Sequence, residues 1–186
     1  MSFTKEQRAY HLRKMRTRMT RLDLNKDGYI SREDYQLMGK KLAEQSKMTE
    51  EQAKATNSEL MKVADLFNLK SGVKLPLEEA AKKASETILS MSPAERKESI
   101  TVGHNLLFDA IDTNKDGHIS VNELKVYFNI IAPGISQAEV IHSFDTIDTD
   151  KNGEISREEF MTAAEDFLHG VEETELSKVF FGTLLD

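Results

Sequence analysis

A twelve-residue pattern occurs three times in this chain of 186 residues. The copies are DLNKDGYISRED at 23–34, DTNKDGHISVNE at 112–123 and DTDKNGEISREE at 148–159. Each copy has an acid at its first and twelfth positions, Asp or Asn at the third and fifth, glycine at the sixth and isoleucine at the eighth. A repeat kept at fixed offsets constrains the fold more than composition does, because the same local structure must form at each copy.

The spacing is that of a calcium-binding loop. A calcium ion takes about six to eight oxygen ligands, from side chains at loop positions one, three and five, the carbonyl at seven, position nine or its water, and a carboxylate at twelve. The glycine permits the sharp turn between them. We therefore expect three metal sites, each with its seventh residue acting through its carbonyl: Asp23, Asn25, Asp27, Tyr29, Ser31 and Asp34; Asp112, Asn114, Asp116, His118, Ser120 and Glu123; and Asp148, Asp150, Asn152, Glu154, Ser156 and Glu159.

The first loop departs from the pattern at its last position. Asp34 stands where the other two loops have Glu. Aspartate is one methylene shorter and reaches bidentate geometry less easily, so we expect weaker calcium binding here, or a preference for the smaller, octahedral magnesium ion.

A fourth, degenerate loop is predicted at 68–79, with the sequence NLKSGVKLPLEE. Loops of this type pair through the apolar residue at position eight, and Leu75 occupies that position here, with Glu79 at position twelve. Lys70 stands at position three, and an ammonium group cannot ligate a cation. We read the segment as a second loop that keeps the pairing and has lost the metal; an ordinary connection between helices is the alternative.

Periodicity and capping signals predict an all-α fold. A boundary between two halves is expected near Ser90, because Ser92, Pro93 and Glu95 together form a strong helix start. The expected helices cover residues 4–22, 32–45, 49–67, 77–90, 92–110, the stretch from the Ser120 cap up to Pro133, 136 to the last loop, and 157–168.

Composition and charge exclude several classes of protein. The chain has no Cys, which rules out disulfides, Cys-ligated metals and thiol nucleophiles. Its net charge of −7 argues against nucleic-acid binding. Residues 1–15 lack the apolar run of a signal peptide and no stretch is long enough to span a membrane, so we expect a cytoplasmic monomer.

Charge is segregated along the chain. Residues 1–22 carry +6, which leaves −13 for the remainder. Such a helix contacts an anionic membrane or target, or it faces the acidic rest of its own molecule; we favour the second reading.

One polar residue stands where the repeat expects an apolar one. The residue directly after loop position twelve begins the inward face of the outgoing helix; it is Leu124 and Phe160 in the later copies and Tyr35 in the first. A buried phenol needs a polar partner, either a neighbouring side chain or a small molecule. Arg18, at the margin of the apolar stripe of the first helix, is expected near it.

Several stretches outside the loops are more specific. RAYHLRKMRTRM, DGYISREDY, GVKLPLEEAA, FLHGVEETEL and the C-terminal FFGTLL resemble the sarcoplasmic calcium-binding proteins and, more closely, the coelenterazine-binding (luciferin-binding) proteins of luminous anthozoans, over essentially the whole chain. The resemblance implies a compact four-EF-hand fold with two EF-hand pairs, residues 1–90 and 91–186, around an apolar core or cavity. It also implies that the cavity, lined by Arg18 and Tyr35, holds coelenterazine and releases it to a separate luciferase when calcium binds.

The related photoproteins oxidise their luciferin in place and differ from this chain. They use Trp side chains around the ligand and a C-terminal proline, whereas this chain has no Trp and ends in Leu184, Leu185 and Asp186. We therefore expect no enzymatic chemistry.

Two alternatives remain for function and for the C-terminus. A calcium and magnesium buffer without an organic ligand needs only the loops, while a calmodulin-like sensor is disfavoured because the eight Met are dispersed. The apolar segment 171–185 is either a lid over the cavity or ordinary core.

Overall fold

The computed structural model describes residues 3–185, which form nine helices and four short strands. Their bounds are α1 Lys5–Leu22, β1 Tyr29–Ser31, α2 Arg32–Gln45, α3 Glu50–Leu66, β2 Lys74–Pro76, α4 Leu77–Ser90, α5 Pro93–Ile111, β3 His118–Ile119, α6 Val121–Ile131, α7 Gln137–Ile147, β4 Ile155–Ser156, α8 Arg157–His169 and α9 Glu175–Val179. The predicted all-α class is confirmed, and the predicted helix bounds agree with the structure to within about two residues.

Most of the helices begin at the expected caps. In α1 the Thr4 hydroxyl accepts a hydrogen bond from the backbone N–H of Gln7, whose side chain accepts one from the Thr4 N–H in return. The same reciprocal capping box opens the helices after Thr49, Ser92, Ser120, Ser136 and Ser156. Sequence analysis missed α9, a single short turn of helix capped by Thr174.

Two antiparallel ladders join the loops in pairs. Strand β1 pairs with β2, which sets Ile30 opposite Leu75, and β3 pairs with β4, which sets Ile119 opposite Ile155. The segment 68–79 therefore pairs with the first loop through Leu75, and this pairing supports reading it as a degenerate second hand over an ordinary connection. A hand here means an incoming helix, its loop and the outgoing helix.

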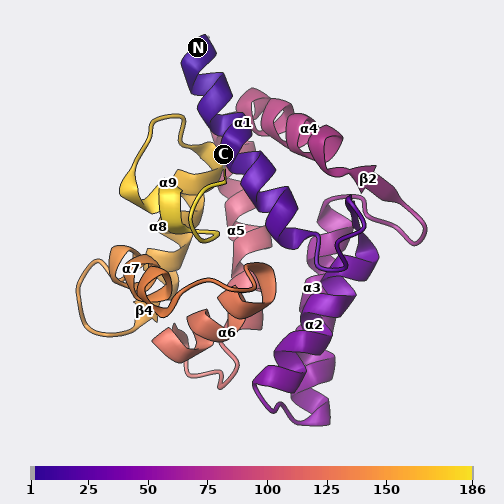
Figure 1. Cartoon of the computed structure of the whole chain (residues 1–186), viewed down its shortest axis with the longest axis vertical. Coiled ribbons are helices and arrows are strands. Elements are labelled where there is room, and N and C mark those ends of the chain that lie inside the picture. Colours follow the sequence, from indigo (N-terminus) through magenta and orange to yellow (C-terminus); the bar gives the residue numbers. More distant parts are fainter. Residues whose placement is uncertain (1–2, 186) are drawn as a thin grey trace.

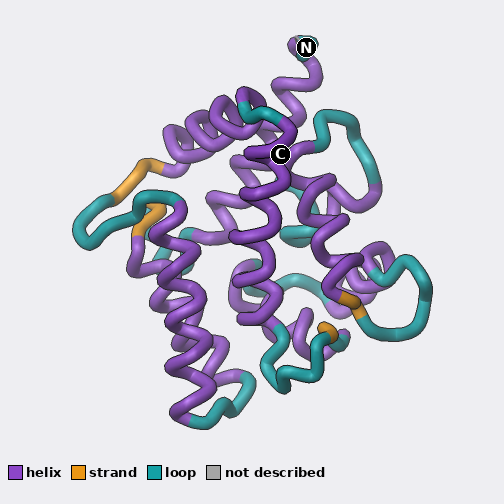
Figure 2. The backbone as a smooth tube through the Cα atoms, turned by 180° about the vertical axis from the view of Figure 1, so that it is seen from behind, coloured by secondary structure: helices purple, strands orange, loops and turns teal. Residues whose placement is uncertain are grey.

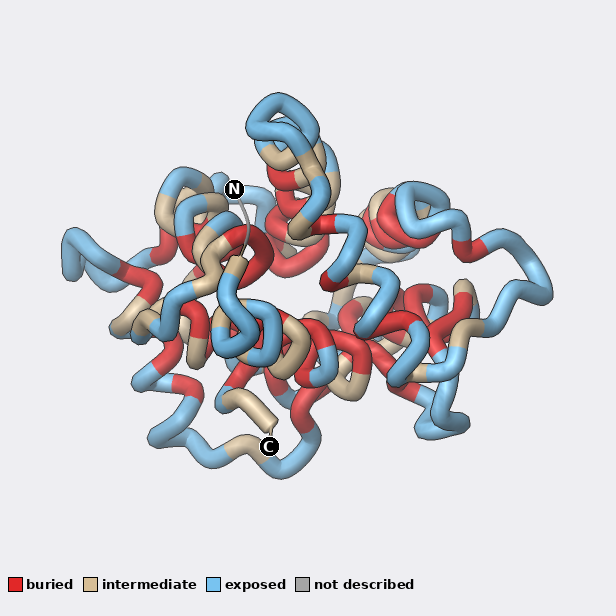
Figure 3. The backbone as a smooth tube through the Cα atoms, turned by 90° about the horizontal axis from the view of Figure 1, so that it is seen from above, coloured by how far each residue is buried: buried red, intermediate tan, exposed pale blue. Residues whose placement is uncertain are grey.

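The helices surround a single core. In Figure 1, α2 and α3 form an antiparallel pair on one side, α6 to α9 lie on the other, and α1 and α5 run between them. The view from behind shows the two ladders at separate places on the periphery (Figure 2). Buried positions converge on the middle of the molecule (Figure 3), and one apolar cluster includes residues from both halves.

The C-terminal segment is part of that core. Phe180 and Phe181 are buried, and the ring of Phe180 contacts those of Phe160 and Phe167 at 5.1 and 5.8 Å between centroids. The backbone N–H of Leu185 donates to the Thr17 hydroxyl on α1 at 3.0 Å. This packing supports the interpretation of ordinary core over that of a lid.

The basic first helix contacts its own molecule. Arg16 forms a bidentate ion pair with Glu78 on α4, with N to O distances of 2.8 and 2.7 Å. Arg13 and Lys14 donate to the carbonyls of Leu185 and Gly170 at 2.7 and 2.6 Å. The described partners are thus an acidic side chain of α4 and two backbone carbonyls from residues 170–185, so the acidic side chains that were expected are only part of them.

Among residues 3–185, no helix combines the length and apolar character that a membrane span requires.

Candidate functional site

The three acidic loops share one hydrogen-bonding scheme, which places their side-chain oxygens on the inside of each turn. In the fourth loop the carboxylate of Asp148 accepts from the backbone N–H groups of Asn152 and Gly153 at 3.2 and 3.0 Å. The first and third loops repeat the bond to the glycine, from Gly28 to Asp23 at 3.1 Å and from Gly117 to Asp112 at 3.0 Å. The first acid of each loop thus holds the turn by accepting hydrogen bonds from backbone N–H groups of the same loop.

The acid at position twelve closes each loop. One carboxylate oxygen of Glu159 accepts from the Thr149 N–H at 2.8 Å and the other from the Ser156 N–H at 2.8 Å. Burial alone would raise the pKa of Glu159, but hydrogen bonds from the Ser156 N–H and hydroxyl, the Asp150 N–H and the Thr149 hydroxyl lower it to about 2. Glu123 makes the same two kinds of bond at 2.9 Å each.

Asp34 reaches equivalent donors despite its shorter side chain. Its two oxygens accept from the N–H groups of Leu24 and Ser31, both at 2.9 Å. The first loop is therefore closed by the same hydrogen bonds as the others, although the side chain of Asp34 is one methylene shorter than that of Glu.

The fourth loop gathers the tightest set of acids. Oxygens of Asp148, Asp150 and Glu159 all lie within 4.8 Å of one another, so one cation could contact all three. In the third loop, Oδ1 of Asp112 is buried and has no donor among the described residues, and burial raises the pKa of this carboxyl. An acceptor without a donor fits a hard cation, and the all-oxygen donor set is the one that calcium prefers.

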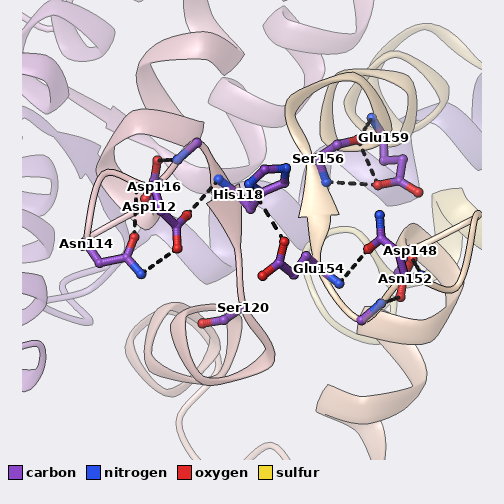
Figure 4. A network of polar contacts seen from close by, with 12 residues as sticks. Asp112, Asn114, Asp116, His118, Ser120, Asp148, Asn152, Glu154, Ser156 and Glu159 are labelled. Carbon is purple, nitrogen blue, oxygen red and sulfur yellow. Dashed lines mark hydrogen bonds and ion pairs between the residues drawn. The ribbon is translucent and has the colours of Figure 1, made fainter.

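The third and fourth loops face each other across their ladder (Figure 4). The side chains of His118 and Glu154, at position seven of each loop, point toward one another with Nδ1 and Oε2 3.8 Å apart. These side chains lie between the loops; that the backbone carbonyl of each residue binds a metal ion in its own loop stays a prediction.

The fourth position of each acidic loop is a lysine in the left-handed region. The φ angles of Lys26, Lys115 and Lys151 are 58°, 61° and 59°. This conformation is uncommon for residues other than glycine, and all three side chains are exposed.

The degenerate second loop meets the first through a lysine. Lys74 Nζ lies 2.7 Å from Oδ2 of Asp27, the residue at position five of the first loop. This contact lowers the pKa of Asp27. Sequence analysis noted Lys70 as the defect of the second loop and missed Lys74, although the register Ser31 to Lys74 places it at the first loop.

A cavity of about 470 Å³ adjoins the N-terminal hands. Its wall is mostly apolar and comes from α1, the β1–β2 ladder, α2, the end of α3, α4, the first half of α5 and the end of α8. Arg18 and Tyr35 both line it. The structure thus brings the two predicted residues to one cavity; that they bind a ligand stays a prediction.

Among residues 3–185, Arg18 has no carboxylate partner in this wall. It is 5% exposed, its guanidinium lies 4.6 Å from the centre of the Phe67 ring, and its Nε has no hydrogen-bond partner among the described residues. Burial lowers the pKa of Arg18, while Tyr35 and Tyr127 oppose that shift. A buried cation with an unused donor is a strong point of attachment for a polar ligand atom.

Further buried polar atoms lie around the same space. Nδ1 of His104, Nδ1 of His169 and the Tyr127 hydroxyl lack partners among the described residues, and the two histidines line the cavity. Burial lowers the pKa of His104 to about 3 and that of His169 to about 4, so both rings are neutral at pH 7. Sequence analysis did not single out these histidines. His104 could have been found, because it lies one helical turn from both Ile100 and Phe108 on the buried face of α5.

Comparisons with known proteins agree with this geometry. The EF-hand domain pair family matches residues 104–165, and an EF-hand family matches residues 16–38. The luciferin-binding protein of Renilla reniformis is 44% identical over 98% of both chains, and the sarcoplasmic calcium-binding protein of Perinereis vancaurica tetradentata is 38% identical over 94% of this chain and 98% of its own.

Solved structures give the same result. The calcium-loaded apo form of coelenterazine-binding protein from Renilla muelleri superimposes with a TM-score of 0.91 at 42% identity, covering 98% of this chain and 100% of its own. Calcium-loaded apo-aequorin from Aequorea victoria, at 20% identity and a TM-score of 0.68, covers 89% and 94% and shares the fold. The chain therefore belongs to the EF-hand family that contains the luciferin-binding and sarcoplasmic calcium-binding proteins.

Proposed function

We propose that this protein binds calcium at its three acidic loops and carries coelenterazine, which it releases when calcium binds. The observation that carries the proposal is the cavity of about 470 Å³, because a protein that only buffers calcium needs no such space. Its volume is within the range of about 300–1,000 Å³ that is typical of small-molecule sites.

The loops would hold calcium through the ligands predicted above: side-chain oxygens at positions one, three, five and twelve, the carbonyl at seven, and position nine. The positive charge of calcium would neutralise the closely spaced carboxylates of each loop. Two carboxylates about 4 Å apart repel each other by roughly 4 kcal/mol at an effective dielectric constant near 20. Binding the ion removes that repulsion and ties the incoming helix to the outgoing helix.

The cavity matches the chemistry of coelenterazine, an aromatic heterocycle with phenolic and carbonyl groups. Apolar side chains such as Met19, Ile30 and Ile88 would bury its rings. The unused donors of Arg18 and the neutral histidines would bind its polar atoms, with Tyr35 beside them. Unpaired donors in an apolar wall favour a ligand with a few acceptors in fixed places.

The relatives support this assignment by name, as luciferin-binding and coelenterazine-binding proteins at 44% and 42% identity. We further propose that the protein is a cytoplasmic monomer, performs no catalysis itself and delivers its ligand to a separate luciferase. The division into an N-terminal pair, residues 1–90, and a C-terminal pair, residues 91–186, is part of the same proposal.

A calcium and magnesium buffer is the second candidate. The observation that favours it is the 38% identity to sarcoplasmic calcium-binding protein, together with the three complete loops. Loop chemistry alone does not separate buffer from carrier, so the test must address the cavity.

The test is coelenterazine binding by absorbance and gel filtration, first in a calcium chelator and then with calcium added. Stoichiometric binding that calcium reverses supports the carrier, and no binding in either state leaves the buffer. Gly103 offers a specific block, because it lines the cavity and a Cβ built there meets no atom within 4 Å.

We expect the side chain of Gly103→Leu to occupy part of the cavity and block coelenterazine binding, while calorimetric calcium binding and thermal stability are kept. Thr101→Leu is the matched control, since Thr101 is an exposed residue of the same helix. Retention of coelenterazine by Gly103→Leu would contradict the assignment of the ligand to this cavity.

A further inference from the structure

The cavity is in contact with one acidic loop much more closely than with the other two. The first hand contributes Met19, four residues before its loop, Ile30 inside the loop, and Tyr35 directly after it. The nearest wall residues on the incoming helix of the third hand and the outgoing helix of the fourth are His104 and Leu168. These lie about two helical turns from Asp112 and Glu159 respectively.

The two ladders repeat this difference. Ile30 and Leu75, which face each other across the first ladder, both line the cavity. Their counterparts Ile119 and Ile155 are fully buried in the core and are absent from the cavity wall. A shift of the first ladder therefore moves the wall directly, whereas a shift of the second acts on packed side chains.

Lys74 connects the first loop to the far strand of that ladder. Its ammonium group binds Asp27, a predicted ligand at position five, and its neighbour along the chain is the wall residue Leu75. An ion in the first loop attracts the Asp27 carboxylate and repels the ammonium group. The ion and Lys74 thus act in opposite directions on one side chain.

We propose that the first loop is the trigger for ligand release and that the third and fourth loops serve the stability of the fold. Closure of the first loop on an ion would draw together α1 and α2, which hold Arg18 and Tyr35 on the wall, and would weaken the ion pair between Asp27 and Lys74 of β2. The inference rests on the proposed carrier function and names the loop that controls it.

Three matched variants test the proposal: Asp34→Asn, Glu123→Gln and Glu159→Gln. Each neutralises the acid at position twelve, and each acid accepts backbone N–H groups from positions two and nine of its own loop, so the structural loss is similar in all three. The protein is loaded with coelenterazine in chelator and titrated with calcium, the released ligand is followed by gel filtration with absorbance, and calorimetry counts the remaining metal sites.

We expect Asp34→Asn to raise the calcium midpoint of release about tenfold or more, because the first loop loses one charged ligand. The other two variants lose a charged ligand in loops that do not control release, so their midpoints should shift by less than about threefold. A wild-type midpoint in Asp34→Asn, with calorimetry showing one site lost, would overturn the proposal. So would a larger shift in Glu123→Gln or Glu159→Gln.

Lys74→Met provides a second test of the first loop as trigger, which applies even if Asp34→Asn does not bind coelenterazine. The side chain is about half exposed, so the fold should tolerate the change. We expect a lower calcium midpoint of release because Asp27 loses its competing cation, and an unchanged or raised midpoint would overturn the proposal. Failure of the carrier function itself is seen separately, as absence of coelenterazine binding by the wild-type protein.

Discussion

The two ladders each join a pair of loops in antiparallel register, and they differ in what lies behind them. Behind the C-terminal ladder, Ile119 and Ile155 are fully buried in the apolar cluster that also contains Phe160, Phe167 and Phe180. Behind the N-terminal ladder lies the cavity, and one of its two loops has Lys70 at the third position, where the other loops have Asn or Asp. One motif thus holds a rigid core on one side and, in our proposal, a ligand site on the other.

The largest expected effect comes from comparing two phenylalanine substitutions, one on each side of the molecule. Phe180→Ala removes a buried ring from the aromatic cluster and should lower the free energy of unfolding by about 3–5 kcal/mol. Phe67→Ala removes a ring that is 40% exposed at the cavity and lies against the Arg18 guanidinium, so about 1 kcal/mol is expected. Urea unfolding followed by circular dichroism measures both, and equal losses would show that the two sides are packed alike.

A pH titration tests the contact between the halves. His11 on α1 is fully buried, bonded to the Ser85 hydroxyl on α4 and the Leu168 carbonyl on α8. Burial lowers the pKa of His11 from 6.5 to about 4. Below pH 6.5 the unfolded chain binds the proton first, so stability is full above that pH and falls as pH decreases toward 4.

From pH 7 to pH 5 the loss due to His11 should be about 2 kcal/mol. Urea unfolding at several pH values measures this slope, and His11→Asn should reduce it. A slope that His11→Asn leaves unchanged would show that other groups cause it.

The first loop can be made more like the others by Asp34→Glu. The longer acid should bind calcium in bidentate fashion more easily, raising affinity about tenfold and lowering competition by magnesium. Calorimetry with and without magnesium checks this, and unchanged affinity and selectivity would show that Asp34 already suffices.

The smallest expected effect concerns the surface contact between α1 and α4. Arg16 and Glu78 are each 48% exposed, so Arg16→Met should lower the free energy of unfolding by less than about 1 kcal/mol, and less still at high salt. Thermal unfolding at two salt concentrations measures the change. A loss above about 2 kcal/mol would show that this pair is an essential link between the helices.

Local signals explain why so much of the fold was predictable. The loops, the capping boxes and the pairing of Leu75 with Ile30 depend on residues within a dozen positions of one another, or on a repeat that fixes its own register. The acids of each loop could be assigned for the same reason.

The cavity was less accessible to such reasoning because its wall comes from distant segments. Arg18 and Tyr35 were expected there from a polar residue in an apolar position, together with a family resemblance. His169 and Lys74 carry no local signal of that kind, since their surroundings arise only when α8 meets α5 and when the two ladder strands align. The short helix α9 was missed because five residues give too little periodicity.

The left-handed lysines make each loop a natural substrate for trypsin. Lys26, Lys115 and Lys151 are exposed and lie at the tip of a turn, where a protease can engage a chain that opens locally. An ion that locks the turn should protect the bond after its own lysine. The fragments of a short digest, weighed by mass spectrometry across a calcium titration, would then give the order in which the three loops fill, without a label or a mutation.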